Sequence, residues 1–464
     1  MDAFGSILSS SVLTGLDLFK PEHNARLFRP YGDQGASWFI TLQILGSETP
    51  VAQEDYHSWE EGRIHESFKI RANVADPGAG NDLVIVVAVA NVTADNKFYP
   101  QVGDDIKLAN QVSGYIRSID VSTPANPTLT IATKSATETF GAVTAGDDVV
   151  IYSNSWGEAG DQPVSRVSKP TKRTGHLKII KTRLSATGSE MTNDVWVNVV
   201  DNKGFQGWYN KTRDIDLSFR HNLAISHSLL VDELVTNTSK VLDASSTAGN
   251  AVAYGTEGLI TAMDARAIPY VKASGALAMD DFYAMNLALT KQHNGSDVLG
   301  LCGNKRMQNV IKILFAANYT TGVDWTKATM DSGIVGDEGD ARARAMAIDV
   351  RTLDIDGRRW HFKNMNEFNN PETLGVDSFP YRDMMAVIPT GKVPDAKSRA
   401  LIPYSGVRYK ALGNYNRRLQ IWTGGASGKD GVYIGSLDVR HDDMRSHIGA
   451  EHVCVNKYLL VKTA

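Results

Sequence analysis

The chain has 464 residues, of which 42% are hydrophobic and 22% charged, a balance that is typical of soluble folded proteins and excludes disordered or membrane-embedded chains. Its length is too great for one ordinary hydrophobic core and predicts about two to four domains. The 48 Lys and Arg residues nearly balance the 52 Asp and Glu residues, and the net charge of -4 excludes a globally basic nucleic-acid binder.

Residues 1–55 show no regular pattern of apolar residues. Pro21, Pro30 and Pro50 interrupt short apolar pieces such as Trp38-Phe39-Ile40. Such a segment has too little periodic apolar surface to fold on itself, so we expect an arm that lies along another surface. A partly disordered leader is the alternative. No basic residue precedes Lys20, so we expect no secretory signal and a soluble protein made inside the cell.

Residues 75–155 differ in character, because they contain no Trp, Cys, Met or His and are rich in Val, Thr, Ala and Asp. Short apolar or alternating runs between turn-forming residues predict a small antiparallel β module, either a barrel or a sandwich. Gly-Asp-Asp occurs twice, each time just before a strand-like run, and nine acids against four bases make the module acidic. The expected strands are Leu83–Ala90, Tyr115–Val121, Leu129–Ala132 and Val149–Tyr152.

The segment 156–192 has the opposite charge. Between residues 161 and 183, seven bases accompany a single acid. The runs 165–169 and 176–182 predict extended strands of a long two-stranded loop, with Pro170 and Gly175 near its bend. One interpretation of these bases is a solvated charged face, and the other is contact with an acidic neighbour.

A long helix is predicted over residues 193–240. Asp232 and Glu233 near its end oppose the helix dipole, so packing must hold that end. The expected apolar face is Phe219, Leu223, Leu230 and Leu234. Residues 241–390 then mix helices with strands, and residues 391–464 are rich in strands. The expected helices are Asp280–Gln292 and Lys305–Asn318, and the expected strands are Ala347–Ile355, Arg359–Lys363, Met384–Ile388 and Val453–Val461.

The candidate catalytic motifs are incomplete. His65-Glu66-Ser67-Phe68-Lys69 has Lys where a zinc protease needs its second His, and Thr423–Asp430 lacks the first Gly and the final Ser or Thr of a phosphate-binding loop. Arg440–His447 holds carboxylates and imidazoles that suit a metal, but its arginines oppose a cation. We therefore expect a salt-bridged interface or surface loop there. Cys302 and Cys454 match no disulfide framework or zinc site and are expected to be small buried hydrophobes.

The order of parts, an arm, a basic β loop, a long helix and a mixed remainder, is accompanied by four distinctive stretches. These are Tyr56–Glu61, Leu177–Thr192, Tyr381–Pro389 and Val453–Val461. Together they resemble the major capsid protein of tailed bacteriophages, which has the Hong Kong 97-type fold, and most of all that of crAss-like podophages. In that family the first stretch is similar to the lead into the extended loop, and the second to the return strand and spine. The last two resemble strands of the later domains.

The resemblance implies an α+β fold with an inserted small all-β domain. It assigns residues 1–55 to the N-terminal arm, 56–74 and 156–192 to the extended loop, and 75–155 to the inserted β-barrel or sandwich. Residues 193–240 become the spine helix, 241–390 the peripheral and axial α/β region, and 391–464 a strand-rich return to those domains.

The resemblance also implies a non-catalytic virion protein, made in the bacterial cytoplasm, with no cofactor or metal. Copies would assemble into pentamers and hexamers of an icosahedral shell enclosing double-stranded DNA, with the portal and other head proteins as further partners. Contact with the DNA would be diffuse and salt-sensitive, and no membrane partner is implied. The physics agrees, because obligate assemblies bury about 2,000–5,000 Å² per interface, and arms and loops supply such area.

Charge complementarity suggests which residues meet between subunits. We expect Lys172 and Arg173 to reach an acidic patch on an adjacent subunit, of which one candidate is Asp331 with Asp337, Glu338 and Asp340. The full set of expected intersubunit contacts is Trp59, Glu60, Glu61, Arg166, Lys169, Lys172, Arg173, Asp337, Glu338, Asp340, Arg440, Asp442, Asp443 and Arg445.

An alternative function is a phage adhesin or decoration protein that binds host glycans through the 75–155 module. Tyr152 and Trp156 would then supply stacking rings. The long helix and the α/β half argue against this alternative, because adhesive β proteins are usually repetitive or rich in strands throughout.

Overall fold

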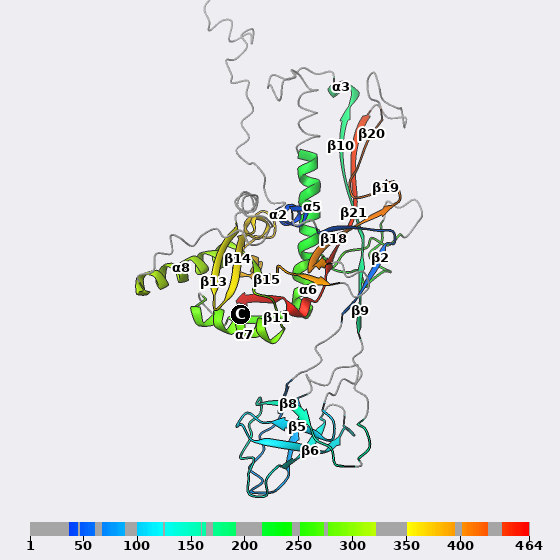
Figure 1. The fold of residues 1–464 in the computed structure, drawn as a ribbon. Coiled ribbons are helices and arrows are strands. Elements are labelled where there is room, and N and C mark those ends of the chain that lie inside the picture. The colour runs from blue at the N-terminus through cyan, green and yellow to red at the C-terminus, as the bar shows by residue number, and fades with distance from the viewer. Residues whose placement is uncertain are drawn as a thin grey trace, which may run out of the picture. The chain divides into compact units, whose positions relative to one another are not determined.

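The structure is a computed structural model, drawn as a ribbon in Figure 1. It describes residues 37–44, 47–60, 67–88, 100–123, 126–158, 160–163, 170–191, 216–243, 251–272, 277–321, 350–394, 401–425 and 439–463. The chain divides into two units. The smaller unit is Ser58–Arg173, and the larger combines Met1–His57 with Thr174–Ala464.

The smaller unit folds as a closed β-barrel. Its strands follow one another in the order β3-β8-β5-β6-β7-β4, and each of these neighbouring pairs is antiparallel. Two backbone hydrogen bonds close the ring, because Arg71 N donates to Val86 O and Ala88 N donates to Lys69 O, each at 2.8 Å. Closure protects both edges of the sheet. The strands are β3 (Phe68–Lys69), β4 (Leu83–Val86), β5 (Asp104–Lys107), β6 (Ser113–Asp120), β7 (Thr128–Thr133) and β8 (Asp148–Asn154).

Alternating apolar residues fill the barrel. Leu83, Ile85, Leu129 and Ile131 are fully buried, and the side chains between them on each strand point away from the core. The four strands predicted in this module are confirmed. Strand β3 was not predicted, whereas β5 is the strand-like run expected after the first Gly-Asp-Asp motif. The barrel already includes Phe68, so the module boundary expected at residue 75 lies too late.

The two Gly-Asp-Asp motifs of the barrel form the same turn twice. Gly103 and Gly146 both have φ +96°, a backbone conformation that strains any residue with a side chain. In each motif the first Asp accepts a hydrogen bond at 2.8 Å from the backbone N–H three residues before it. The repeated sequence therefore encodes a repeated turn, which leads into β5 in one case and β8 in the other.

One six-stranded sheet of the larger unit has the order β1-β18-β21-β10, with β19 on β18 and β20 on β21. Strand β1 runs parallel to β18, and the other pairs are antiparallel. Helices α2, α5 and α6 pack against this sheet in one buried cluster (Figure 1). These elements are α2 (Ser37–Ile44), β1 (Glu48–Val51), β10 (Lys178–Thr187), α3 (Gly188–Met191), α5 (Ser218–Val231), α6 (Leu259–Arg266), β18 (Ser405–Leu412), β19 (Tyr415–Asn416), β20 (Gln420–Gly425) and β21 (Val439–His452).

The second sheet of the larger unit has the order β11-β22-β15-β12-β14-β13 and mixes parallel with antiparallel pairs. Helix α7 packs on it, and Phe282 meets Trp360 and Phe362 edge-on at centroid distances of 5.3 and 6.2 Å. Two short pairs, β2 with β9 and β16 with β17, complete the described strands.

The elements of this second region are β11 (Ile268–Lys272), α7 (Met279–Lys291), β12 (Asp297–Cys302), α8 (Asn304–Thr321), β13 (Val350–Ile355), β14 (Arg358–Asn364), α10 (Asn366–Asn369), η4 (Pro380–Asp383), β15 (Met385–Pro389), η5 (Val455–Lys457) and β22 (Leu459–Thr463). The short pairs are β2 (Asp55–Glu60), β9 (Thr171–His176), β16 (Lys392–Pro394) and β17 (Leu401–Pro403). The described chain is thus α+β, and the predicted helices at 280–292 and 305–318 and the predicted strands at 359–363 and 384–388 are confirmed. The predicted strand at 347–355 is confirmed from Val350 onward, and residues 347–349 lie outside the described residues. The closing strand begins later than expected, because residues 455–457 form η5.

The prediction of an arm over residues 1–55 is wrong for its last part. Trp38 on α2 is only 1% exposed and lies in the core of its own chain, while β1 is a strand of the first sheet. The backbone N–H of Trp38 donates to Glu367 Oε1 at 2.8 Å. The sequence did not reveal helix α2, because a short helix that is apolar on most sides shows no amphipathic period. Residues 1–36 lie outside the described residues.

The predicted long helix over 193–240 also needs correction. The described helix α5 ends at Val231, and residues 192–215 lie outside the described part. Asp232 follows the helix, and its carboxylate accepts hydrogen bonds from Lys178 Nζ at 2.7 Å and Ser228 Oγ at 2.9 Å. A neighbouring cation, in addition to packing, therefore stabilises this end. The buried face is His221, Ile225, Ser226, Ser228, Leu229 and Leu230, so of the expected stripe only Leu230 is fully buried.

Candidate intersubunit surfaces

Strands β10, β21 and β20 form a three-stranded ribbon. Ten residue pairs join β10 to β21, from Lys178 opposite Ile448 to Thr187 opposite Val439, and six more join β20 to the other edge of β21. At about 3.3 Å per residue, ten pairs span about 33 Å. Because residues directly opposite each other share a face, the register sorts every side chain of the ribbon to one of two faces.

Helix α5 covers one face of the ribbon through a buried polar contact. His221 Nδ1 lies 2.9 Å from Thr182 Oγ1, and His221 Nε2 lies 2.8 Å from Ser446 Oγ. Burial lowers the pKa of His221, so the imidazole is neutral and uses one nitrogen as donor and the other as acceptor. Because both ring nitrogens of His221 have hydrogen-bond partners on the ribbon, these contacts fix the position of helix α5 on that face.

The other face of the ribbon carries charged and aromatic side chains. Arg183 Nε and Nη2 donate to Asp443 Oδ1 and Oδ2 at 2.6 and 2.8 Å, a bidentate pair. The Arg183 guanidinium holds the pKa of the Asp443 carboxyl below its usual range. At the next pair on this face, two residues along each strand, Lys181 lies opposite Arg445, and the Arg445 guanidinium lies 4.7 Å from the ring centre of Trp422.

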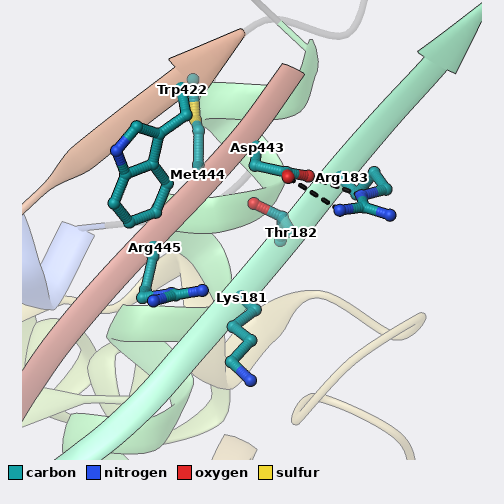
Figure 2. A pocket seen from close by; sticks show the side chains of 7 residues that line it. All are labelled: Lys181, Thr182, Arg183, Trp422, Asp443, Met444 and Arg445. Atoms are coloured by element: carbon teal, nitrogen blue, oxygen red, sulfur yellow. Dashed lines mark hydrogen bonds and ion pairs between the residues drawn. The ribbon is translucent and has the colours of Figure 1, made fainter. Parts of the chain in front are cut away.

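These side chains line a pocket of about 180 Å³ (Figure 2). Its three bases and one acid give it a formal charge of +2. Arg183 is engaged by Asp443, whereas no carboxylate among the described residues lies within ion-pair distance of Lys181 or Arg445. The pocket is lined by Lys181, Thr182, Arg183, Trp422, Asp443, Met444 and Arg445.

The run Arg440–His447, expected to be an interface or surface loop, is part of strand β21. Asp442 is fully buried, accepts a hydrogen bond from Thr423 Oγ1 at 2.5 Å, and lies 3.6 Å from Arg440 Nε. Its carboxylate therefore faces neighbours within the chain and not solvent. Of the four predicted contacts in this run, the structure brings Asp443 and Arg445 together on the outer face and places Arg440 and Asp442 on the other face.

Four further predicted contacts lie on β2 and β9. Trp59 is 63% exposed and Lys172 is also exposed, but Arg173 Nε pairs at 3.4 Å with Glu60 of its own chain. The expectation that Arg173 serves a neighbouring subunit is weakened, because that intrachain carboxylate already occupies it.

The predicted bend at Gly175 is wrong. Gly175 lies inside β9, which pairs with β2, and β10 continues almost directly to pair with β21. A Cβ atom on Gly175 would lie within 2.6 Å of three atoms of Tyr56. Glycine is required there because the Tyr56 ring packs onto the backbone while its hydroxyl donates to Ala450 O.

Six of the predicted contacts lie outside the described residues. They are Glu61, Arg166, Lys169, Asp337, Glu338 and Asp340.

Exposed apolar side chains form surfaces that the sequence reasoning missed. Leu412 and Tyr415 are 72% and 61% exposed and flank the two-residue Gly413-Asn414 turn between β18 and β19. A Gly-Asn pair between apolar residues is a hairpin signal, so the turn could have been predicted, although the exposure could not. On α7, Tyr283 and Leu287 form a second exposed pair.

Among the described residues, no group of three His, Cys, Asp or Glu side chains is arranged to hold a metal ion, and no helix is long and apolar enough to cross a membrane. Cys302 is buried, as predicted, and burial raises the pKa of its thiol to about 12. Cys454 is only half-buried, so the prediction that both cysteines are buried is wrong for Cys454.

No family model and no curated protein matches the sequence, whereas solved structures show a remote likeness. A structure from Microbacterium phage Oxtober96 has 8% identity and a TM-score of 0.41, covering 99% of this chain and 100% of that chain. The capsid structure of the cyanophage P-SCSP1u has 9% identity and a TM-score of 0.35, covering 68% and 81%. The capsid of a native GTA particle has 9% identity and a TM-score of 0.37, covering 99% and 100%. These TM-scores are too low for the likeness to carry an argument about this chain.

Proposed function

We propose that this chain is the major capsid protein of a tailed bacteriophage, of the Hong Kong 97 type and closest to crAss-like podophages. Copies assemble into pentamers and hexamers of an icosahedral shell around double-stranded DNA. The portal and other head proteins are its further partners, and the protein is made in the host cytoplasm. The β-barrel is the inserted domain.

The observation that carries this proposal is the exposed aromatic and charged face of the β10–β21–β20 ribbon. Helix α5 covers one face, while the other presents Trp422, 41% exposed, beside arginines in a pocket. Trp and Arg are the residues that dominate protein interfaces, and solitary soluble proteins seldom leave such combinations exposed. The exposed Leu412 and Tyr415 at the β18–β19 turn add apolar area of the kind that obligate assemblies bury.

The predicted intersubunit contacts remain part of this proposal, but the structure places them in surroundings of different exposure. Trp59 and Lys172 remain exposed candidates on β2 and β9, and Arg445 is the best-placed candidate on the ribbon. Asp442 is buried within the chain, so its contribution is to hold the ribbon itself.

The direct test is to purify the full chain and examine it by electron microscopy and multi-angle light scattering. Closed shells, rings of five or six copies, or tubes are the expected products. A monodisperse monomer at all protein and salt concentrations tested would refute the proposal.

A second candidate function is glycan binding by the β-barrel, and one observation favours it. Trp156 and Tyr152 are about half exposed, and Lys134 Nζ lies 3.2 Å from the Tyr152 hydroxyl and 2.8 Å from Asp105 Oδ1. Exposed rings next to hydrogen-bonding groups suit sugar recognition. Binding of the chain to a glycan array that is lost in Trp156→Ala would support this function, and equal binding by that variant would refute it.

A further inference from the structure

We propose that the pocket between β10, β21 and β20 binds a carboxylate side chain of a second copy of this chain, supplied by that copy's acidic segment 331–340. The inference deepens the proposed function and rests on it, because copies must meet for the contact to form. It names the segment that contacts one face of the ribbon and the residue types in that contact, Lys and Arg on the ribbon and Asp or Glu on the segment.

The first argument is the placement of two like charges directly opposite each other. Lys181 and Arg445 are register partners in the β10–β21 ladder. Like charges in that position destabilise a sheet, whereas the adjacent pair on the same face, Arg183 and Asp443, is complementary and bidentate. In the described part of the chain no carboxylate forms an ion pair with Lys181 or Arg445, although Asp443 attracts Arg445 at longer range. An anion bound between them would remove the repulsion and gain two ion pairs.

The second argument is that one of these cations is already held in place. The Arg445 guanidinium lies over the Trp422 ring at 4.7 Å, which limits the positions that it can take. Asp443 is occupied by Arg183, so it competes little for the other two bases. A ligand therefore meets one preorganised donor, Arg445, and loses less entropy on binding it.

The third argument is size, which favours a side chain over a nucleotide. The pocket volume is about 180 Å³, whereas sites for small molecules usually span about 300–1,000 Å³. Ile179 lies on the same face, next to Lys181 in the alternation of β10, and is 44% exposed. An apolar neighbour beside Trp and Arg matches the composition of protein interfaces better than that of a phosphate-binding surface.

The fourth argument identifies the acidic segment. Two stretches of ten residues, 53–62 and 331–340, carry four carboxylates and no Lys or Arg. The first stretch is used within its own chain, because Glu54 pairs with Lys410, Asp55 with His176, and Glu60 with Arg173. The second contains three glycines, and its formal charge of -4 complements the +2 of the pocket.

The test begins with binding, measured separately from assembly. A fluorescent peptide with the sequence of residues 331–340 is titrated with unassembled full-length chain, and its anisotropy is followed. We expect saturable, salt-sensitive binding that weakens about tenfold or more in Lys181→Glu/Arg445→Glu. That variant keeps a like-charged pair, so its ladder is no more strained than the original, and circular dichroism checks its fold. Lys107→Glu/Lys240→Glu changes the net charge equally at two exposed lysines and should bind normally.

Assembly provides the second readout. We expect the Lys181→Glu/Arg445→Glu chain to lose shells or rings in electron micrographs, and a chain that also carries Asp337→Lys/Glu338→Lys to regain them. Equal peptide binding by the pocket variant and the original chain would overturn the inference, as would a pocket variant that loses only its affinity for a short single-stranded oligonucleotide. Failure of the unmutated chain to form any oligomer would instead refute the proposed function, while peptide binding would still decide on the pocket.

Discussion

Replacing Trp38 by Ala tests whether the segment before β1 belongs to the folded core. Burying an indole removes about 200 Å² from water, worth about 5 kcal/mol at about 25 cal/mol per Å². However, Trp38 Nε1 is buried with no hydrogen-bond partner among the described residues, and such an unpaired donor costs about 2 kcal/mol. We therefore expect Trp38→Ala to lower the free energy of unfolding of the larger unit by about 3 kcal/mol.

The assay is urea unfolding of the unassembled chain, followed by circular dichroism. Trp38→Phe keeps most of the apolar area and removes the unpaired N–H, so it should lose less than about 1 kcal/mol. Ile40→Ala is the matched control, because Ile40 lies on the same helix but is exposed. The reasoning fails if Trp38→Ala and Ile40→Ala have the same urea midpoint, since α2 would then not be part of the cooperative core.

Three other predictions concern the larger unit. A Cβ atom on Gly258 would lie 2.6–2.7 Å from backbone atoms at the end of α5, so Gly258→Ala should lower the free energy of unfolding by about 1–3 kcal/mol. Gly295→Ala, where a Cβ atom meets open space, should lower it far less. Equal urea midpoints for the two variants would contradict this prediction. Burial lowers the pKa of His447 to about 4 and of His452 to about 3, so between about pH 6.5 and pH 5 only the unfolded chain gains these protons. As the pH falls through this range, the free energy of unfolding therefore decreases by up to about 1.4 kcal/mol per pH unit for each imidazole. His452→Gln should reduce this dependence on pH, and an unchanged dependence would show that His452 is not buried in its neutral form. Finally, a thiol reagent should label Cys454 in the native chain but should label Cys302 only after denaturation, because burial shields the Cys302 thiol and raises its pKa. Equal labelling rates of the two cysteines in the native chain would contradict the burial of Cys302.

Local patterns could be predicted from the sequence, and distant pairings could not. The helices α7 and α8 and four of the six barrel strands follow from the spacing of apolar residues within each segment. The β10–β21 ladder joins residues as far apart as Arg183 and Asp443, which are 260 positions apart, and no local pattern encodes that pairing. The predicted loop bend at Gly175 failed for this reason, because the partner of β10 lies at the other end of the chain.

The candidate surface could be predicted only in part, because the face on which each residue lies depends on pairing with distant strands. Charge predicted a salt-bridged interface or surface loop at Arg440–His447; ion pairs of Asp442 and Asp443 are present, but the run is a strand and not a loop. Which face each residue occupies depends on the register with β10 and β20, so the sequence could not separate the buried Asp442 from Asp443 on the opposite face. The cation–π contact of Arg445 with Trp422 and the exposed Leu412 were invisible for the same reason.

The pairing of β2 with β9 has a consequence for how this chain can change. Those two strands carry the polypeptide out of the larger unit and back into it, so the entry and exit of the barrel are adjacent. A unit attached by neighbouring ends can be lost, replaced or enlarged without rethreading the remaining strands, since a short linker bridges the gap. A change in the length or identity of the barrel is therefore expected to leave the strands of the larger unit in place.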